Sequence, residues 1–572
     1  RLHLRDELDA VQKELSEISG VTALLYVQTC AAEKRRRRRT GAFAPIDTRV
    51  FIDPDVCEGC GDCGVQSNCV ALLPLETPLG RKRAVDQSAC NADYSCLKGF
   101  CPSFVTVTGG TPRKPDLADL AIPPLPEPEK PAIAGTWNMV VTGIGGTGAV
   151  TIGAVLAMAA HLEEKGAGMI EMAGLAQKGG AVHIHLRLAN APQDIAAIRV
   201  SAGQADALIG GDLVTSAAPA TQALLRPDRA QAVVNAHETP TGAFTQDPDF
   251  VFPARGLTGR LEAALGAGRL TLVEAVDLAT RALGDAIFAN MLLTGAAWQK
   301  CLIPLEKSSI MEAIGLNGTA VEGNRRAFEL GRWAAAAPDD LARHLDRQHT
   351  ETQAETSDPI DLRARHLAAY QSERLAARYR AFVARVPDAD LREPVARGYH
   401  KLLSYKDEYE VARLLSDARG KAAARFEGDL GLRFHLAPPL LTGTGPDGRP
   451  RKRAFGQWLL PAFKLLARLK FLRGTPADPF GWTAERRMER RLIRDYERDM
   501  DEAFTRLSPG TREAVRELAE LPLAIRGFGP VKAQAAEAAA ARRDALMAEI
   551  RSPRARRVDR GGVRVANVAI PS

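Results

Sequence analysis

The chain has 572 residues, of which 45% are hydrophobic and 25% are charged, and a formal net charge of +7. This composition is typical of globular protein and excludes a disordered or fibrous chain, and the length suits three or four domains. No run of about 18 or more apolar residues occurs, so we expect no membrane span, and the small basic excess suits an acidic partner or a phosphorylated cofactor.

Residues 1–43 predict one helix and one strand. Apolar residues recur every three or four positions through residues 1–20, which indicates an amphipathic helix, and residues 21–27 (VTALLYV) predict a buried strand. One helix and one strand cannot form a core alone, so we expect them to end an α/β domain whose body lies upstream. The chain starts at Arg1 without a signal or transit peptide, which agrees with a missing N-terminal part and a cytoplasmic protein.

A basic run, EKRRRRR, occupies residues 33–39. It predicts either an anion site or a solvated linker between domains. Because no aromatic residues are interspersed for base stacking, we do not expect nucleic-acid binding.

Seven of the nine cysteines fall within residues 57–102. They are Cys57, Cys60, Cys63, Cys69, Cys90, Cys96 and Cys101. The first three follow a double Cys-x2-Cys spacing with glycines between them, which lets the backbone turn tightly toward inorganic sulfide, and Pro102 follows the last. This pattern predicts a 4Fe-4S cluster bound by Cys57, Cys60, Cys63 and Cys101.

The other three cysteines of this segment leave several interpretations open. Cys69, Cys90 and Cys96 suit a second cluster that lacks one thiolate, a zinc site, or plain buried thiols. Zinc is also the alternative for the first four cysteines, although structural zinc sites prefer two well-separated Cys-x2-4-Cys pairs. Disulfides are not expected, because clustered thiols in a chain of this size more often bind metal or react.

We expect strands on both sides of the cysteines, at residues 49–52 and 104–107. The segment that follows is rich in proline up to about residue 135, which favours extended structure and indicates an inter-domain linker. A new domain then begins near Thr136.

A strand, a glycine loop and a helix open this domain: residues 138–142 (NMVVT), then GIGGTG, then an apolar stretch to about residue 161. The loop glycines are Gly143, Gly145, Gly146 and Gly148. They permit a tight turn and the approach of a phosphate group to the helix N-terminus. Glu171, in the next strand, is placed to bind an NAD ribose, so dinucleotide binding is one interpretation and a loop used only for packing is the other.

The rest of this domain predicts strands at residues 168–172, 182–188, 205–210 and 231–235. Helices are expected at residues 272–281 and 285–297. His183 and His185 alternate onto one face of their strand, where ordinary half-buried residues or contacts with a substrate are the two interpretations. Cys301 is expected to be a core thiol.

From about residue 335 the sequence is rich in Ala, Arg, Leu and Glu and predicts mainly helices. The clearest patterns cover residues 363–385, 393–415, 484–507 and 512–521. Residues 451–471 form a basic amphipathic segment that contains Trp458. It predicts a helix packed on its own protein, or a docking surface for a partner or a membrane.

Several long strings resemble the C-terminal half of single-chain indolepyruvate ferredoxin oxidoreductases, which are members of the 2-oxoacid:ferredoxin oxidoreductase family. They cover nearly the whole chain and are QTCAAEKRRRRR, VCEGCGDCGVQSNC, CNADYSCLKGFCPSF, VVTGIGGTGAVTIGAVLAMAAH, GLAQKGGAVHIHLRL, RGYHKLLSYKDEYEVARL, FHLAPPLL and DPFGWTAERRMERRLI.

The resemblance implies a multidomain α/β fold. Its expected parts are the end of a thiamine diphosphate-binding domain (residues 1–43), a small ferredoxin-like 4Fe-4S module (44–110), a proline-rich linker (111–135), a Rossmann-like γ-type catalytic domain (136–333) and a mainly helical C-terminal domain (334–572). The glycine loop then belongs to the CoA and substrate side of the active site rather than to an NAD site.

The family's activity implies oxidative decarboxylation of arylpyruvates to arylacetyl-CoA, with CoA as co-substrate and electron transfer through iron–sulfur to ferredoxin, in a homodimer.

This sequence departs from the family's motifs in two ways. The spacing from Cys90 to Cys101 is not the regular one of two-cluster ferredoxins, so a second cluster stays open. The Gly-Asp-Gly thiamine motif is absent, so thiamine diphosphate and Mg are expected upstream or in a partner subunit, the chain alone is expected to be inactive, and no catalytic residue is assigned.

Two other functions remain as alternatives. One is an NAD(P)H-linked iron–sulfur oxidoreductase that uses the GIGGTG loop, and the other is a zinc-stabilised scaffold.

Overall fold

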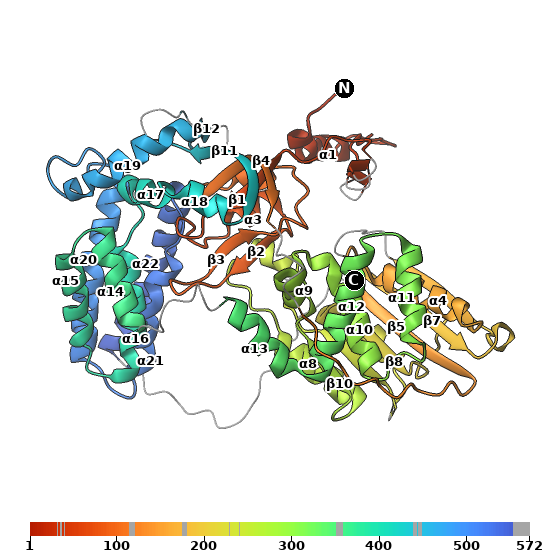
Figure 1. The fold of residues 1–572 in the computed structure, drawn as a ribbon. Coiled ribbons are helices and arrows are strands. Elements are labelled where there is room, and N and C mark those ends of the chain that lie inside the picture. Colours follow the sequence, from red (N-terminus) through yellow and green to blue (C-terminus); the bar gives the residue numbers. More distant parts are fainter. Residues whose placement is uncertain are drawn as a thin grey trace. The chain divides into compact units, whose positions relative to one another are not determined.

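The computed structural model describes residues 1–30, 33–34, 37–38, 41–113, 121–173, 180–227, 229–239, 241–349, 358–438, 443 and 449–552 (Figure 1). It divides into two compact units, residues 1–46 and residues 47–572. In the described ranges, no helix is both long enough and apolar enough to cross a membrane.

The first unit contains the short 3-10 helix η1 (Arg5–Glu7) and helix α1 (Leu8–Ser16), so the predicted N-terminal helix is confirmed in a shorter form. The predicted strand at residues 21–27 is wrong. These residues have no regular secondary structure and most of their apolar side chains are exposed, because no described strand lies beside them to satisfy their backbone groups. Of the basic run, residues 35, 36 and 39 lie outside the described residues, and Arg37 forms an ion pair with Glu33 at 2.7 Å.

A four-stranded antiparallel sheet carries the cysteine-rich segment. Strands β1 (Thr48–Ile52) and β4 (Phe104–Pro112) flank the cysteines and pair with each other, as the sequence predicts. The sheet is completed by β11 (Phe426–Leu436) and β12 (Arg453–Gly456), which come from the C-terminal region (cyan beside orange in Figure 1). These two strands were not predicted. Because the sheet is shared in this way, a self-contained ferredoxin-like module is not confirmed.

The cysteines themselves lie on short elements between β1 and β4. These are α3 (Asp62–Ser67), the hairpin of β2 (Leu72–Leu75) and β3 (Lys82–Val85), and the 3-10 helix η2 (Ser95–Lys98). Such short elements have little core of their own, so their position depends on the sheet and on neighbouring regions.

The next region is built on a six-stranded sheet in the order β10-β9-β8-β5-β7-β6. The strands are β5 (Thr136–Ile144), β6 (Gly166–Ala173), β7 (Ala181–Ala189), β8 (Ala207–Gly210), β9 (Gln231–Asn235) and β10 (Leu270–Val273). Strands β10, β9, β8 and β5 are parallel, whereas β7 is antiparallel to both of its neighbours. All five predicted strands are confirmed. The helix predicted at residues 272–281 is wrong at its start, because β10 continues the parallel sheet to Val273.

Helices cover both faces of this sheet. One face is covered by α4 (Ala149–Leu162), α9 (Ala275–Leu283), α10 (Ala289–Gln299), α11 (Lys307–Asn317) and α12 (Val321–Ala336), and the other by α5 (Leu213–Ser216) and α8 (Ala254–Leu265). The short elements of this region are η4 (Pro192–Asp194), α6 (Pro219–Gln222), α7 (Ala243–Gln246) and η5 (Ala286–Phe288). A longer helix, α13 (Pro338–His349), follows α12.

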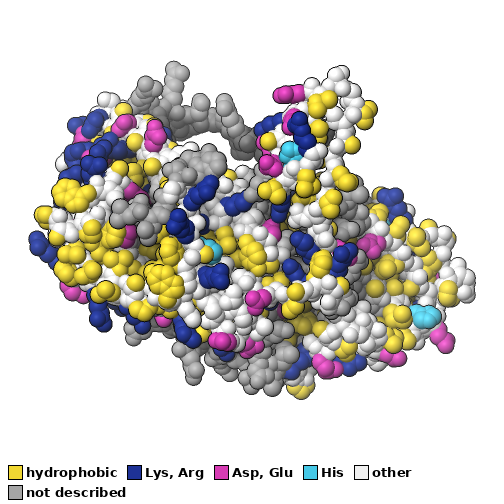
Figure 2. Space-filling view, turned by 90° about the horizontal axis from the view of Figure 1, so that it is seen from above, with side chains coloured by type: hydrophobic (Ala, Val, Ile, Leu, Met, Phe, Trp, Pro, Cys, Tyr) yellow, Lys and Arg dark blue, Asp and Glu magenta, His cyan; other side chains and the backbone are white. Residues whose placement is uncertain are grey.

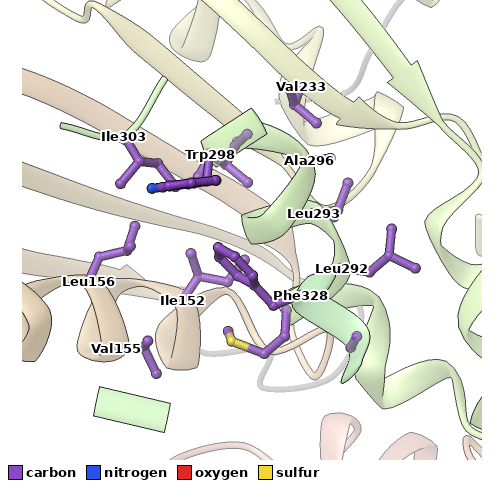
Figure 3. Packing of buried hydrophobic residues seen from close by; sticks show 14 of the residues in the cluster. Ile152, Val155, Leu156, Val233, Leu292, Leu293, Ala296, Trp298, Ile303 and Phe328 are labelled. Atoms are coloured by element: carbon purple, nitrogen blue, oxygen red, sulfur yellow. The ribbon is translucent and has the colours of Figure 1, made fainter. Parts of the chain in front are cut away.

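The two faces of the sheet contribute to two separate cores. On β5, Met139 and Val141 pack with α4, α10 and α12, while Val140 between them packs on the opposite side with α5 and α8. Figure 3 shows side chains of α4 and α10 around Phe328 of α12 in the larger core. The proline-rich segment has no regular structure in residues 121–133, and Ile122 and Leu125 pack on this core.

The C-terminal region is mainly helical, as predicted. Its elements are α14 (Pro359–Tyr370), α15 (Glu373–Ala384), α16 (Ala389–Leu403), α17 (Glu408–Leu415), α18 (Ala418–Ala423), η6 (Gln457–Leu459), α19 (Leu460–Arg468), η7 (Leu469–Leu472), α20 (Ala484–Thr505), α21 (Arg512–Glu520), η8 (Leu521–Ala524) and α22 (Gly529–Arg551). The single pattern at residues 363–385 is two helices, because Ser372 accepts a hydrogen bond from the Leu375 amide and starts a new one.

The basic amphipathic segment forms β12, η6, α19 and η7 instead of one helix. Phe463 of α19 packs edge-to-face on Phe434 of β11, with 5.1 Å between ring centroids, so one side of the segment packs on its own protein. Trp458 remains 68% exposed. Figure 2 shows hydrophobic and Lys or Arg side chains close together on the face seen from above.

A buried ion-pair network in the helical region yields a stability prediction. Glu489 of α20 is 3% exposed and pairs with Arg486 and Lys532. Burial alone raises its pKa, but these two cations outweigh burial and lower the pKa. We expect Glu489→Gln to lower the free energy of unfolding by about 3 kcal/mol at pH 7, because the buried Lys532 loses its counter-charge and Arg486 keeps only its longer contacts with Glu408 and Glu485.

The pH dependence of this effect follows from the lowered pKa of Glu489. The stabilisation is present above the unfolded-state pKa of about 4.3 and is lost as the pH falls through the lower folded-state pKa. Urea unfolding of both proteins at a series of pH values measures it, with the exposed Glu513→Gln as the matched control. An equal loss at pH 7 and well below pH 4 contradicts the ion-pair origin.

Candidate metal centre

Four of the predicted ligands line one small pocket. Cys57, Cys60, Cys63 and Cys101 surround it together with apolar side chains such as Phe104. Cys57 and Cys60 come from the loop that leads into α3, Cys63 lies in the first turn of α3, and Cys101 comes from the segment just before β4. All nine cysteines are free of disulfides.

Glycines position the loop that carries the first three cysteines. Gly59 has a φ of 67°, and a Cβ atom there would lie 2.3 Å from the carbonyl oxygen of Arg81. Its amide donates a hydrogen bond to Sγ of Cys57 over 3.3 Å. Gly61 has a φ of 78° and begins α3, with Pro248 occupying the space of a side chain. Only glycine permits this conformation and these contacts at both positions.

The four thiols strongly influence one another. Burial raises the pKa of Cys60 to about 12, and the neighbouring Cys101 adds to the increase. Burial also raises the pKa of Cys63 and of Cys101. Four thiolates this close together and this well buried need a positively charged group between them, and the iron of a cluster bound by four cysteines supplies it.

The residues therefore fit a 4Fe-4S cluster in number, chemistry and backbone hydrogen bonding. Within the described ranges, no three His, Cys, Asp or Glu side chains are arranged to hold a metal ion. A single zinc ion requires its sulfur ligands to converge on one point about 2.3 Å away, whereas a cluster is bound at separate corners.

Two cations, the half-buried Lys452 and the buried Arg83, lie beside the thiol pocket. Nζ of Lys452 donates to the carbonyl oxygens of Gly99 and Cys101, and lies 5.1 Å from the ring centroid of Phe104. Arg83 is 2% exposed and donates to the carbonyl of Pro248 over 3.1 Å. Neither residue was predicted: Lys452 lies far from the ligand motif in the sequence, and no local pattern marks Arg83 within the cysteine-rich segment. Their positive charge favours thiolates and the reduced form of a bound cluster.

We expect Lys452→Met to lower the reduction potential of the cluster. Removal of one positive charge beside Cys101 costs the reduced state about 1–4 kcal/mol, which for one electron is on the order of 40–170 mV. A redox titration followed by electron paramagnetic resonance measures the change, with Lys464→Met on the exposed side of α19 as control. An unchanged or raised potential contradicts this role.

The second cysteine group lies close to the first. Cys96 is buried on η2, and Cys69 and Cys90 are half-buried. Burial raises the pKa of Cys96 to about 12, with further contributions from the other two. The three thiols are thus near one another, and the described part of this unit adds no fourth cysteine to them. A second cluster remains a prediction.

The glycine loop packs tightly against α10. Gly146 and Gly148 have φ values of 102° and 85°, and Gly148 begins α4. A Cβ atom on Gly148 would lie 2.3 Å from Nδ2 of Asn290, and one on Gly143 would lie 2.6 Å from Oγ1 of Thr147. The amide of Gly145 donates to the carbonyl of Gly180 over 2.7 Å. Close packing therefore accounts for glycine at Gly143 and Gly148, and the positive φ accounts for it at Gly146.

The placement of Glu171 does not support an NAD site. This residue is exposed on β6, an edge strand that β7 separates from β5 and the glycine loop. Gln177, Lys178 and Gly179 lie outside the described residues.

The remaining candidate side chains have structural partners. His183 lies 3.0 Å from Oγ1 of Thr221, and Nδ1 of His185 accepts from the amide of Val200 over 3.0 Å. Burial lowers the pKa of both. Cys301 is half-buried at the end of α10 with a φ of 62°, so the predicted core position is wrong.

The cysteine-bearing helix packs directly on the α/β region. Oγ1 of Thr245 in α7 donates to Oδ1 of Asn68 over 2.7 Å, at the end of α3. A Cβ atom on Gly64 would lie 2.7 Å from the carbonyl of Thr245, so the two backbones touch. This contact joins the thiol pocket to the domain with the glycine loop.

Comparison with known proteins identifies two segments. Residues 138–334 match the family described as "Pyruvate ferredoxin/flavodoxin oxidoreductase". Residues 356–545 match a "Family of unknown function (DUF6537)".

Two curated relatives are archaeal proteins, and each matches about a third of this chain. "Indolepyruvate oxidoreductase subunit IorB" of Methanothermobacter thermautotrophicus is 27% identical over 203 residues, which is 35% of this chain and 98% of the relative. The protein of the same name from Pyrococcus horikoshii is 28% identical over 202 residues, 35% of this chain and 96% of the relative.

Among solved structures, the γ subunit of a keto/oxoacid ferredoxin oxidoreductase from Geobacter sulfurreducens has 21% identity and a TM-score of 0.26, and covers 35% of this chain and 99% of its own. The pyruvate oxidoreductase subunit PORC from Thermotoga maritima has 19% identity and a TM-score of 0.26, covering 34% and 95%.

Residues 138–334 thus match the pyruvate ferredoxin/flavodoxin oxidoreductase family. Over 35% of its length the chain is similar to the proteins named indolepyruvate oxidoreductase subunit IorB.

Proposed function

We propose that this chain is the iron–sulfur and γ-type part of an oxidoreductase that decarboxylates arylpyruvates, such as indolepyruvate, to arylacetyl-CoA and passes the electrons to ferredoxin. The observation that carries the proposal is the group of four cysteines around one pocket, on a helix that packs against the family's α/β domain. The names of the archaeal relatives support the choice of substrate.

The chain's own residues have definable roles in this proposal. Cys57, Cys60, Cys63 and Cys101 hold the cluster, and Lys452 stabilises its negative charge. Phe104 and its apolar neighbours exclude water from the pocket. When bound, a 4Fe-4S cluster accepts and releases single electrons, which a one-electron acceptor such as ferredoxin requires.

The thiamine diphosphate, Mg and CoA sites of the proposed reaction lie outside the cysteine pocket. Thiamine diphosphate and Mg are bound by an upstream portion or a partner subunit, because the sequence lacks the thiamine motif. Gly143, Gly145, Gly146 and Gly148 are placed on the CoA side of the active site. The assembly is a homodimer, and the domains keep the boundaries expected from the sequence, except that β11 and β12 of the C-terminal region complete the sheet of the cysteine-rich module.

The test is the content of iron and acid-labile sulfide in anaerobically purified protein. About four of each per chain is expected, and about eight shows that the second cysteine group is also filled. Zinc without sulfide overturns the proposal. With the thiamine diphosphate portion present, indolepyruvate and CoA are expected to reduce ferredoxin faster than pyruvate and CoA. An equal rate overturns the choice of substrate.

A further inference from the structure

A cavity of about 710 Å³ lies between the cysteine-rich segment and the helical region. One wall consists of Asp55, Glu58 and the turn between β2 and β3, and the other consists of side chains from α14, α16 and α17. Its volume is in the range of sites for small molecules. The cavity is separate from the thiol pocket, with which it shares only Glu58 among the lining residues.

Lys82, the first residue of β3, lines this cavity and is 9% exposed. Its ammonium group makes no hydrogen bond or ion pair with any residue that the structure describes. Burial, with a further contribution from the nearby Lys406, lowers its pKa to about 7. A buried cation without a counter-charge costs free energy, and proteins keep such groups mainly at functional sites.

Two cations in the walls of the cavity have no carboxylate of their own. Six lysine or arginine side chains line the cavity, and two of them, Arg397 and Arg413, pair with Glu520 and Glu410, which do not line it. Each of the four carboxylates that line the cavity already has a cationic partner. The pairs are Glu58 with Lys401 and Lys406, Asp55 with Lys421, Glu76 with Arg81, and Glu393 with Arg363.

Two histidines in the wall do not change this balance. His366 and His400 lie 3.0 Å apart through their ring nitrogens, and burial lowers the pKa of both, to about 4 for His366. They are neutral at physiological pH and offer polar atoms to a ligand without adding charge.

We propose that this cavity binds a small molecule with a doubly charged oxyanion group, a phosphate ester or a dicarboxylate, and that the ammonium of Lys82 is its ion-pair partner. The two negative charges complement Lys82 and the second lysine beside Glu58, and they give Lys82 an ion-pair partner that the described residues do not supply. The proposal assigns ligand binding to the helical region, of which residues 356–545 match a family of unknown function. The inference does not rest on the proposed decarboxylation.

The test measures binding of three simple probes to the full chain, purified anaerobically. Inorganic phosphate, malonate and acetate are titrated at constant ionic strength while the thermal unfolding midpoint, Tm, is recorded. Phosphate or malonate is expected to raise Tm, and acetate, which has one charge, is not. A shift with phosphate alone identifies a phosphate ester, and a shift with malonate alone identifies a dicarboxylate. No shift with either overturns the proposal.

Two variants assign the effect to Lys82. In Lys82→Met, the affinity for the effective probe is expected to fall about tenfold or more, whereas the exposed Lys464→Met retains it. Without a probe, Lys82→Met is expected to have a Tm equal to or above that of the wild type, because an unpaired buried charge has been removed. A lower Tm, a failure to fold, or an unchanged affinity overturns the role of Lys82.

Discussion

Replacement of Cys60 by alanine is expected to remove the iron–sulfur cluster and, with it, the reduction of ferredoxin. Cys60 is one of four thiols around a single pocket, and the described residues of this pocket offer no other side chain that takes its place as a sulfur ligand. Iron and sulfide are expected to fall from about four of each per chain to near zero, and ferredoxin reduction by about 100-fold or more.

The measurements for Cys60→Ala are iron and sulfide content, the visible spectrum, and bleaching of that spectrum by indolepyruvate in the holoenzyme. Cys301→Ala is the matched control, because this half-buried thiol lies at the end of α10, outside the pocket. A Cys60→Ala protein with full iron content and normal bleaching shows that Cys60 is not a ligand and that the electron path lies elsewhere.

Gly331→Ala is expected to destabilise the α/β region severely. Gly331 of α12 faces α10 so closely that a Cβ atom would lie 1.8 Å from the carbonyl oxygen of Leu292. Gly295 of α10 makes the reciprocal contact, with a distance of 1.9 Å from its Cβ position to the carbonyl oxygen of Phe328. A methyl group at Gly331 therefore forces the two helices apart and opens the core around Phe328, which we expect to cost about 3 kcal/mol or more.

Urea unfolding followed by circular dichroism measures this loss. Gly256→Ala on α8 is a matched control, because nothing lies within 4 Å of its Cβ position and its φ is not positive. There the same substitution is expected to stabilise the helix by about 0.5–1 kcal/mol. Equal stabilities for the two variants contradict the tight packing of α10 on α12.

The two substitutions change different parts of the protein, a proposed cluster ligand in one case and a hydrophobic core in the other. Cys60→Ala removes a ligand and leaves the apolar contacts of the sheet in place. Gly331→Ala acts on the core between α10 and α12, which contains none of the four cysteines, so its effect on the cluster is indirect. Iron content per folded chain separates the two, since it falls in the first variant and stays near the wild-type value in the folded fraction of the second.

Local patterns explain which predictions were successful. The strands at residues 138–142 and 231–235 are short apolar runs in a sheet covered on both faces, so their sequence alone indicates burial. The helices of the C-terminal region follow from apolar spacing, and Ser372 divides one pattern because its side chain caps the next helix. The spacing of Cys57, Cys60 and Cys63 likewise depends on only a few consecutive residues.

The wrong predictions concern features that depend on distant partners. Residues 21–27 have the composition of a strand but no described strand beside them. Strand β11 forms because β4 is available to pair with it, although their sequences are far apart. The sequence predicted that a helix begins at Leu272 and Val273, but these residues pair with β9 in the parallel sheet. Hydrogen-bond partners of this kind are not visible in a local pattern.

The sequence by itself determined the four candidate ligands, the glycine loop and the division into α/β and helical regions, because each depends on the chemistry and spacing of nearby residues. Only the tertiary structure decided that the four thiols share one pocket, that Lys452 lies beside Cys101, and that Lys82 is buried without a hydrogen-bond or ion-pair partner among the described residues. The physical reason is that burial and electrostatic fields are produced by groups that meet only after the chain folds.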